Sequence, residues 1–160
     1  TPLYSSAASD VYKRQMLGTN DSAIEGTNGC PVAPERYYEN MKTIINRLLA
    51  LYPNCRIVVH RPLWYSPNTY NGAKYLEEGL RRLQDYYPQI QRLVDYYASH
   101  FPGQVFLGDT KGFDYFKENH LTDFQVEKGN AGVFYLHPNE KGAVRLGELW
   151  SEAIRQALGL

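Results

Sequence analysis

The sequence lacks several features that would each indicate a particular class of protein. Lysine plus arginine and aspartate plus glutamate both number 17, so the 160-residue chain has no net charge and no basic surplus for nucleic acid or an anionic membrane. A run of about 18 apolar residues is also missing, so we expect no transmembrane helix. Cys30 and Cys55 fit no metal-binding spacing, and we expect neither a metal nor a cofactor. These two cysteines could be free thiols or a disulfide.

Tyrosine, by contrast, is abundant. The chain has 14 tyrosines, 6 phenylalanines and 2 tryptophans. A tyrosine ring can be buried while its hydroxyl stays in water, so the surplus suits the rim of a core or a site that stacks on sugars. We assign most of these residues to the rim of the core.

Hydrophobic periodicity predicts alternating strands and helices. The expected elements are a helix over 35–52, a strand over 55–60, a loop over 61–73, a helix over 73–100, a strand over 104–107, a short helix over 113–119, an irregular stretch to 135 and a helix after 138. Pro88 predicts a break or kink in the second long helix. The alternation favours a single α/β domain in which helices cover a parallel sheet.

The first fifteen residues do not fit this pattern. A strand should precede Gly18, but only Met16 and Leu17 resemble one, because Lys13 and Arg14 would be costly inside a covered sheet. One interpretation is an edge strand with solvated charges. The other, which we favour, is a non-native or disordered leader over 1–15, since 5–15 resembles translated adapter sequence. The domain would then occupy residues 16–160.

Two short motifs carry residues suited to acyl transfer. Gly18-Thr19-Asn20-Asp21 combines a glycine that permits a tight turn with an asparagine amide that can donate to an oxyanion, although such residues also form plain turns. His137-Pro138-Asn139 places a histidine, the usual base for a serine nucleophile, just before a helix. The alternative is that this histidine and the proline after it only mark the start of the helix.

Together, and in this order, the two motifs resemble the SGNH/GDSL hydrolase family. Residues 18–21 are similar to the third block of the family, whose asparagine helps to build the oxyanion hole, and His137 with Gly142 is similar to the fifth block, whose histidine is the base. The resemblance implies a three-layer, flavodoxin-like parallel sheet that is incomplete at its N-terminus. It also implies cofactor-free ester hydrolysis, often of acetyl esters on carbohydrates, and export, although we recognise no signal peptide.

The sequence departs from the family in two ways. The Gly-Asp-Ser block that carries the nucleophile is absent, so we expect this chain to be inactive or nearly so. The position three residues before His137, where the family usually has aspartate, holds Phe134. Glu127, Asp123 and Asp109 are the candidates for the acid, and Asp109 is more typical of a turn cap.

The loop after the strand over 55–60 is the expected substrate-binding segment, because loops at the carboxyl ends of parallel strands line ligand sites. Its candidate residues are Arg61, Trp64, Tyr65, Asn68 and Tyr70. Aromatic rings there could stack on a sugar, with the arginine and the asparagine donating hydrogen bonds. The alternative is a loop that packs its own rings over the edge of the sheet.

These observations predict an ester hydrolase, most specifically a carbohydrate O-acetyl esterase acting on a small-molecule or carbohydrate ester. We expect no nucleic-acid partner. Two alternatives stay open. The first is a non-catalytic α/β carbohydrate-binding module, and the second is a lipase-type or thioesterase-type acylhydrolase on the same fold.

Overall fold

Three short parallel strands form the sheet of this protein. The computed structural model describes residues 13–26 and 29–160. Within them, β1 (Lys13–Gln15), β2 (Ile57–Val59) and β3 (Val105–Leu107) pair in the order β1-β2-β3. The register joins Lys13 to Ile57 and Ile57 to Val105, so the carboxyl ends of all three strands meet at one edge.

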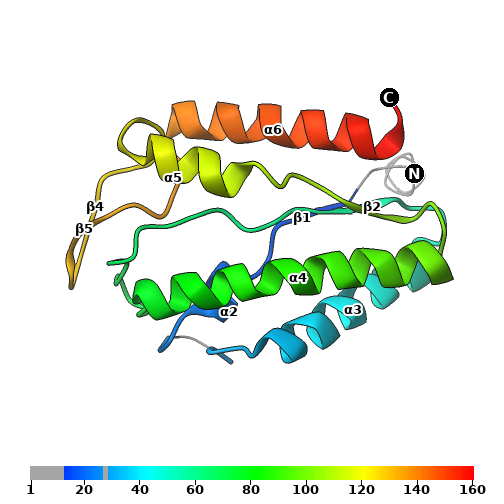
Figure 1. Ribbon diagram of the computed structural model, residues 1–160, viewed down its shortest axis with the longest axis horizontal. Helices are drawn as coiled ribbons and strands as arrows, with labels where there is room; N and C mark the ends of the chain where they lie inside the picture. Colours follow the sequence, from blue (N-terminus) through cyan, green and yellow to red (C-terminus); the bar gives the residue numbers. More distant parts are fainter. Residues whose placement is uncertain (1–12, 27–28) are drawn as a thin grey trace, which may run out of the picture.

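Helices lie on two sides of this sheet. Their bounds are α2 (Thr19–Ser22), α3 (Pro34–Leu51), α4 (Leu76–His100), α5 (Gly112–Asp123) and α6 (Glu140–Leu158). Figure 1 shows α5 and α6 on one side of the strands and α3 and α4 on the other. Both α4 and α6 contact β3. The expected α/β class is therefore confirmed.

The paired helices α3 and α4 bury the apolar stripes that the periodicity predicts. Met41 and Ile45 of α3 and Leu83 of α4 are buried to 2% exposure or less. Tyr37 of α3 stacks on Tyr86 of α4 with ring centroids 4.1 Å apart. Burying these side chains supplies most of the stability of helices that would be marginal alone.

Three local expectations are wrong. The second long helix runs through Pro88 without a break, because the burial of neighbouring side chains offsets the lost backbone hydrogen bond. The first strand consists of Lys13–Gln15 rather than Met16 and Leu17, whereas the non-native origin of the expected leader over 1–15 stays a prediction. The remainder of that leader, 1–12, lies outside the described residues. The stretch expected to be irregular contains an antiparallel hairpin of β4 (Glu127–Gly129) and β5 (Gly132–Phe134).

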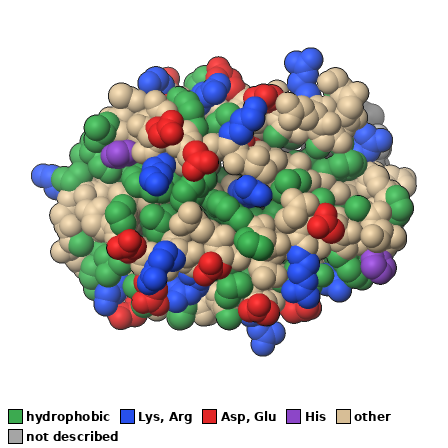
Figure 2. All heavy atoms as spheres, in the orientation of Figure 1, with side chains coloured by type: hydrophobic (Ala, Val, Ile, Leu, Met, Phe, Trp, Pro, Cys, Tyr) green, Lys and Arg blue, Asp and Glu red, His purple; other side chains and the backbone are tan. Residues whose placement is uncertain are grey.

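The surface carries charges of both signs. Figure 2 shows acidic and basic side chains interspersed with apolar ones over the face in view. Across the described ranges, no helix is long and apolar enough to span a bilayer. Cys30 and Cys55 are not joined in a disulfide.

Candidate active site

Asn20 lies in the one-turn helix α2, which follows the carboxyl end of β1. Gly18 precedes this helix with a φ of 129°, a backbone conformation that suits glycine. A Cβ there would also approach the rings of Tyr86 and Tyr37 to 3.1 and 3.2 Å. The turn that presents Asn20 thus depends on Gly18 both for its backbone angles and for space.

A tyrosine holds the side chain of Asn20. The buried Tyr75 donates its hydroxyl hydrogen to Oδ1 of Asn20 at 2.9 Å. Burial raises the pKa of Tyr75, so this hydroxyl keeps its proton and remains a donor. With Oδ1 occupied, the amide hydrogens on Nδ2 are the groups that Asn20 can offer to a ligand.

His137 lies in the segment between β5 and α6, where Glu127 of β4 contacts it. Nδ1 of His137 is 3.0 Å from each carboxylate oxygen of Glu127, and the backbone N–H of His137 donates to Oε1 at 3.1 Å. Because a carboxylate only accepts, Nδ1 carries a proton in this pair. When the ring is neutral, Nε2 is then the nitrogen that can accept a proton from a reactant.

Asn20 and His137 line the same cavity, whose volume is about 350 Å³. The other polar side chains on its wall belong to Thr19, Asn71 and Tyr75. The apolar part of the wall consists of Met16, Leu63, Trp64, Leu136, Pro138 and Leu146. Two motifs that are more than a hundred residues apart in the chain therefore converge on one site. A larger, open groove lies along α6, but its wall has no histidine or asparagine.

The other two candidate acids have structural partners. Asp109 accepts the backbone N–H groups of Lys111 and Gly112 at 3.0 and 2.9 Å, which is the turn-capping role considered for it. Asp123 is fully buried and accepts from Tyr115, Thr122 and Lys141 at 2.7–2.8 Å. Of the three candidates, Glu127 is the one that contacts His137.

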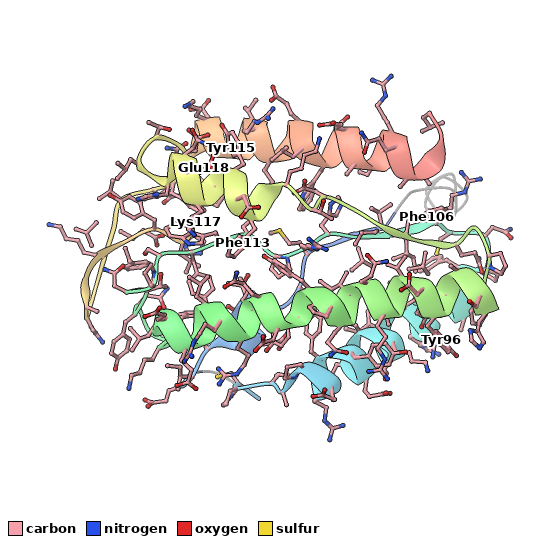
Figure 3. All side chains as sticks on the ribbon, in the orientation of Figure 1. Tyr96, Phe106, Phe113, Tyr115, Lys117 and Glu118 are labelled. Carbon is pink, nitrogen blue, oxygen red and sulfur yellow. The ribbon has the colours of Figure 1, made fainter. Side chains whose placement is uncertain are left out.

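Asp123 anchors the start of α6 to the end of α5. Figure 3 shows Tyr115 on α5, beside α6, and its hydroxyl donates to Oδ2 of Asp123 at 2.8 Å. Burial alone raises the pKa of Asp123, but hydrogen bonds from Lys141, Thr122 and Tyr115 outweigh it, so the pKa lies below its usual value. The backbone carbonyl of Asp123 accepts from Asn139 at 3.0 Å, which fixes the segment next to His137.

Of the five expected substrate-binding residues, the described wall of the cavity contains Trp64 alone. Tyr65 is fully buried and its hydroxyl is 2.9 Å from Oγ of Ser22, so its ring is not available to a sugar. The guanidinium of Arg61 lies over the ring of Tyr87, 5.1 Å from its centroid. Asn68 and Tyr70 contact the β4–β5 hairpin instead.

Sequence reasoning missed Asn71 and Tyr75, which lie just beyond the segment singled out. No pattern links Tyr75 to Asn20, because the two residues are 55 positions apart and meet only through tertiary packing. Asn71 carries a local signal, since its Oδ1 accepts from the backbone N–H groups of Gly72 and Ala73 in an Asx turn.

Among the residues that the structure describes, no serine lines the cavity. Ser22 is buried, and its hydroxyl contacts the carbonyl of Thr19 and the hydroxyl of Tyr65. Ser66 accepts from the backbone N–H of Tyr135 at 2.8 Å. The described residues likewise contain no group of three or more potential metal-ligating side chains.

The sequence was also compared with models of known protein families. The model of the GDSL-like Lipase/Acylhydrolase family matches residues 15–145, which include both motifs. The chain therefore belongs to the GDSL-like lipase/acylhydrolase family, a family of ester hydrolases. A search of curated proteins found no match, and a search of solved structures found none either.

Proposed function

We propose that the chain provides the acid–base and oxyanion-binding half of a serine acylhydrolase, in which His137 is the base, Glu127 the acid and Asn20 the oxyanion donor. A serine hydroxyl from outside the described wall attacks the ester carbonyl, and its proton passes to Nε2 of His137. Nδ2 of Asn20 donates to the oxyanion that forms. His137 returns the proton to the leaving alkoxide, and water then repeats the sequence on the acyl-enzyme.

The observation that carries this proposal is the shared cavity of Asn20 and His137, together with the contact between His137 and Glu127. The base is oriented by a carboxylate through Nδ1, which leaves Nε2 for proton transfer. We further propose that the sheet belongs to the three-layer, flavodoxin-like arrangement of the family. Helices on two sides of a parallel sheet support this.

The substrate we propose is an acetyl ester of a carbohydrate. The cavity, at about 350 Å³, is at the small end of ligand pockets, which suits a short acyl group better than a long chain. Trp64 offers an apolar surface and Asn71 an amide for a sugar hydroxyl. A lipase-type or thioesterase-type activity gains support from the apolar side chains of Leu63, Leu136 and Leu146.

Because no serine among the described residues lines the cavity, the test supplies the nucleophile as hydroxylamine. Its nitrogen attacks the carbonyl of phenyl acetate and its proton goes to His137, so the products are acetohydroxamic acid and phenol. We expect the chain to catalyse this transfer, and His137→Ala and Asn20→Ala each to slow it roughly tenfold or more. Equal rates in all three proteins would overturn the hydrolase site and favour the non-catalytic carbohydrate-binding module.

Two further measurements refine the proposal. Without hydroxylamine, we expect the chain to hydrolyse phenyl acetate at the background rate, and turnover that survives replacement of every serine would contradict the serine mechanism. With hydroxylamine, acetylated xylose should be a better donor than a long-chain phenyl ester or an acyl thioester. The reverse order would replace the carbohydrate esterase with a lipase-type or thioesterase-type acylhydrolase.

A further inference from the structure

The β4–β5 hairpin is fastened to the loop that follows β2 by a set of hydrogen bonds, here called the clasp. On the loop side the clasp comprises Ser66, Asn68 and Tyr70. Ser66 exchanges two hydrogen bonds with the backbone of Tyr135, at 2.9 and 2.8 Å. The carbonyl of Tyr70 accepts from the backbone N–H of Asn130 at 2.8 Å.

Asn68 makes the side-chain bridge at the centre of the clasp. Its Nδ2 donates to the carbonyl of Val133 at 2.5 Å and to the carbonyl of Ala131 at 3.2 Å. An amide nitrogen carries two hydrogens, and both are used by these two carbonyls. Asn68 is also absent from the described wall of the cavity. The structure thus places the amide of Asn68 on the hairpin, whereas the sequence suggested a donor to a substrate.

The bridge from Asn68 matters because the strands of the hairpin are short. Each of its strands has three residues, and a two-stranded hairpin of this size is marginal in water. Val133 is 43% exposed, so it adds little burial, and Phe134 is the buried anchor of β5. Yet this hairpin carries Glu127 and leads directly into His137. The position of the carboxylate relative to the imidazole thus depends on where the hairpin is held.

We infer that Asn68 is a positioning residue that keeps Glu127 on Nδ1 of His137 by fixing the β4–β5 hairpin. The inference rests on the proposed function, because only that function makes Glu127 the acid and His137 the base. The position of Glu127 relative to His137 can be measured in this chain without any ester turnover.

The experiment records the tautomer of His137 in the ¹⁵N-histidine-labelled chain, under alkaline conditions that keep the ring neutral. Long-range ¹H–¹⁵N spectra distinguish a proton on Nδ1 from one on Nε2. We expect the Nδ1–H form in the unaltered chain, because Glu127 accepts from Nδ1. Asn68→Asp keeps the size of the side chain but removes both donors, and Asn68→Ala removes the amide altogether. Both should shift the ring toward the Nε2–H form.

Two control variants show whether a change in the His137 tautomer is caused by the loss of the Glu127 contact. Glu127→Gln should abolish the preference for Nδ1–H, and Asn54→Asp, at an exposed turn far from the hairpin, should leave it unchanged. If Glu127→Gln kept the Nδ1–H form, the acid–base pair of the proposed function would fail. If Glu127→Gln lost that form while both Asn68 variants kept it, the positioning role alone would be overturned.

A second measurement follows the hairpin directly. Loss of two hydrogen bonds should speed amide exchange in β4 and β5 roughly tenfold in Asn68→Asp, while exchange in α3 and α4 stays the same. Uniformly faster exchange, or a variant that fails to fold, would overturn the inference. Asn68 would then support the whole domain rather than the acid–base pair.

Discussion

Glu127 lies directly opposite Phe134 in the antiparallel pair of β4 and β5, and its carboxylate reaches Nδ1 of His137 at 3.0 Å. Phe134 occupies the position three residues before His137, where the resemblance to the SGNH/GDSL family leads us to expect an aspartate. Here the neighbouring strand supplies a carboxylate from the facing position. The longer side chain of glutamate helps it to reach across the pair.

The first prediction concerns Glu127. Glu127→Gln replaces an acceptor with an amide that can donate to Nδ1, so the tautomer with its lone pair on Nε2 is no longer favoured. We expect hydroxylamine-dependent acyl transfer to fall by roughly tenfold, and by no more than in His137→Ala. Glu118→Gln, on the exposed surface of α5 (Figure 3), is the matched control and should transfer at the unaltered rate. A comparable loss in both variants would show a general effect of charge removal.

The second prediction concerns the hydroxyl of Tyr75. Tyr75→Phe keeps the buried ring but frees Oδ1 of Asn20, so the amide can turn over and present an acceptor to the oxyanion. We expect kcat for acyl transfer to fall roughly tenfold with KM little changed, because the lost interaction acts in the transition state. In a double-mutant cycle with Asn20→Ala, the Tyr75 effect should vanish. Additive losses would mean that Tyr75 acts elsewhere.

The third prediction is a pH dependence of stability. Hydrogen bonds hold the pKa of Asp123 below its usual value, so the folded state favours the carboxylate. The resulting stabilisation is fully present above the ordinary aspartate pKa and is lost as pH falls through the lowered one. Asp123→Asn should reduce the free energy of unfolding by about 1–3 kcal/mol at neutral pH. Urea unfolding across a pH series should show this difference shrinking in acid, and a constant difference would refute the linkage.

The fourth prediction concerns the packing of the hairpin. A Cβ on Gly129 would collide with the backbone carbonyl of Tyr70, so Gly129→Ala must displace the hairpin from the clasp. We expect a loss of about 1–3 kcal/mol in the free energy of unfolding, measured by denaturant titration. Gly147→Ala, where a Cβ on the exposed face of α6 meets nothing within 4 Å, should instead stabilise by up to about 1 kcal/mol. Destabilisation of both would indicate a general intolerance of added methyl groups.

The sequence predicted the long helices well because their signals are long. The stripe through Met41 and Ile45 spans several turns, and α3 is confirmed within a residue or two of its expected bounds. The hairpin was missed because Glu127–Gly129 and Gly132–Phe134 are three residues each and contain glycine, which weakens any strand pattern.

The site was only partly accessible to sequence reasoning. The rule that ligand sites form at the carboxyl ends of parallel strands pointed to Asn20, which lines a cavity with His137. The same rule pointed to Tyr65 and Asn68, but local sequence does not tell whether a loop side chain faces the cavity or the protein. Tertiary packing buries Tyr65 and turns Asn68 toward the hairpin.

The clasp also has a consequence for the order in which the molecule assembles. Asn68 and Val133 are 65 residues apart, and Tyr75 and Asn20 are 55 apart, so each of these two contacts closes a long loop of chain. Closing long loops carries an entropic cost that must be met before the contact adds stability. Each helix of the α3–α4 pair, in contrast, can grow from local interactions. The two helices should therefore form early, before the contacts of Asn68 with Val133 and of Tyr75 with Asn20 complete the site.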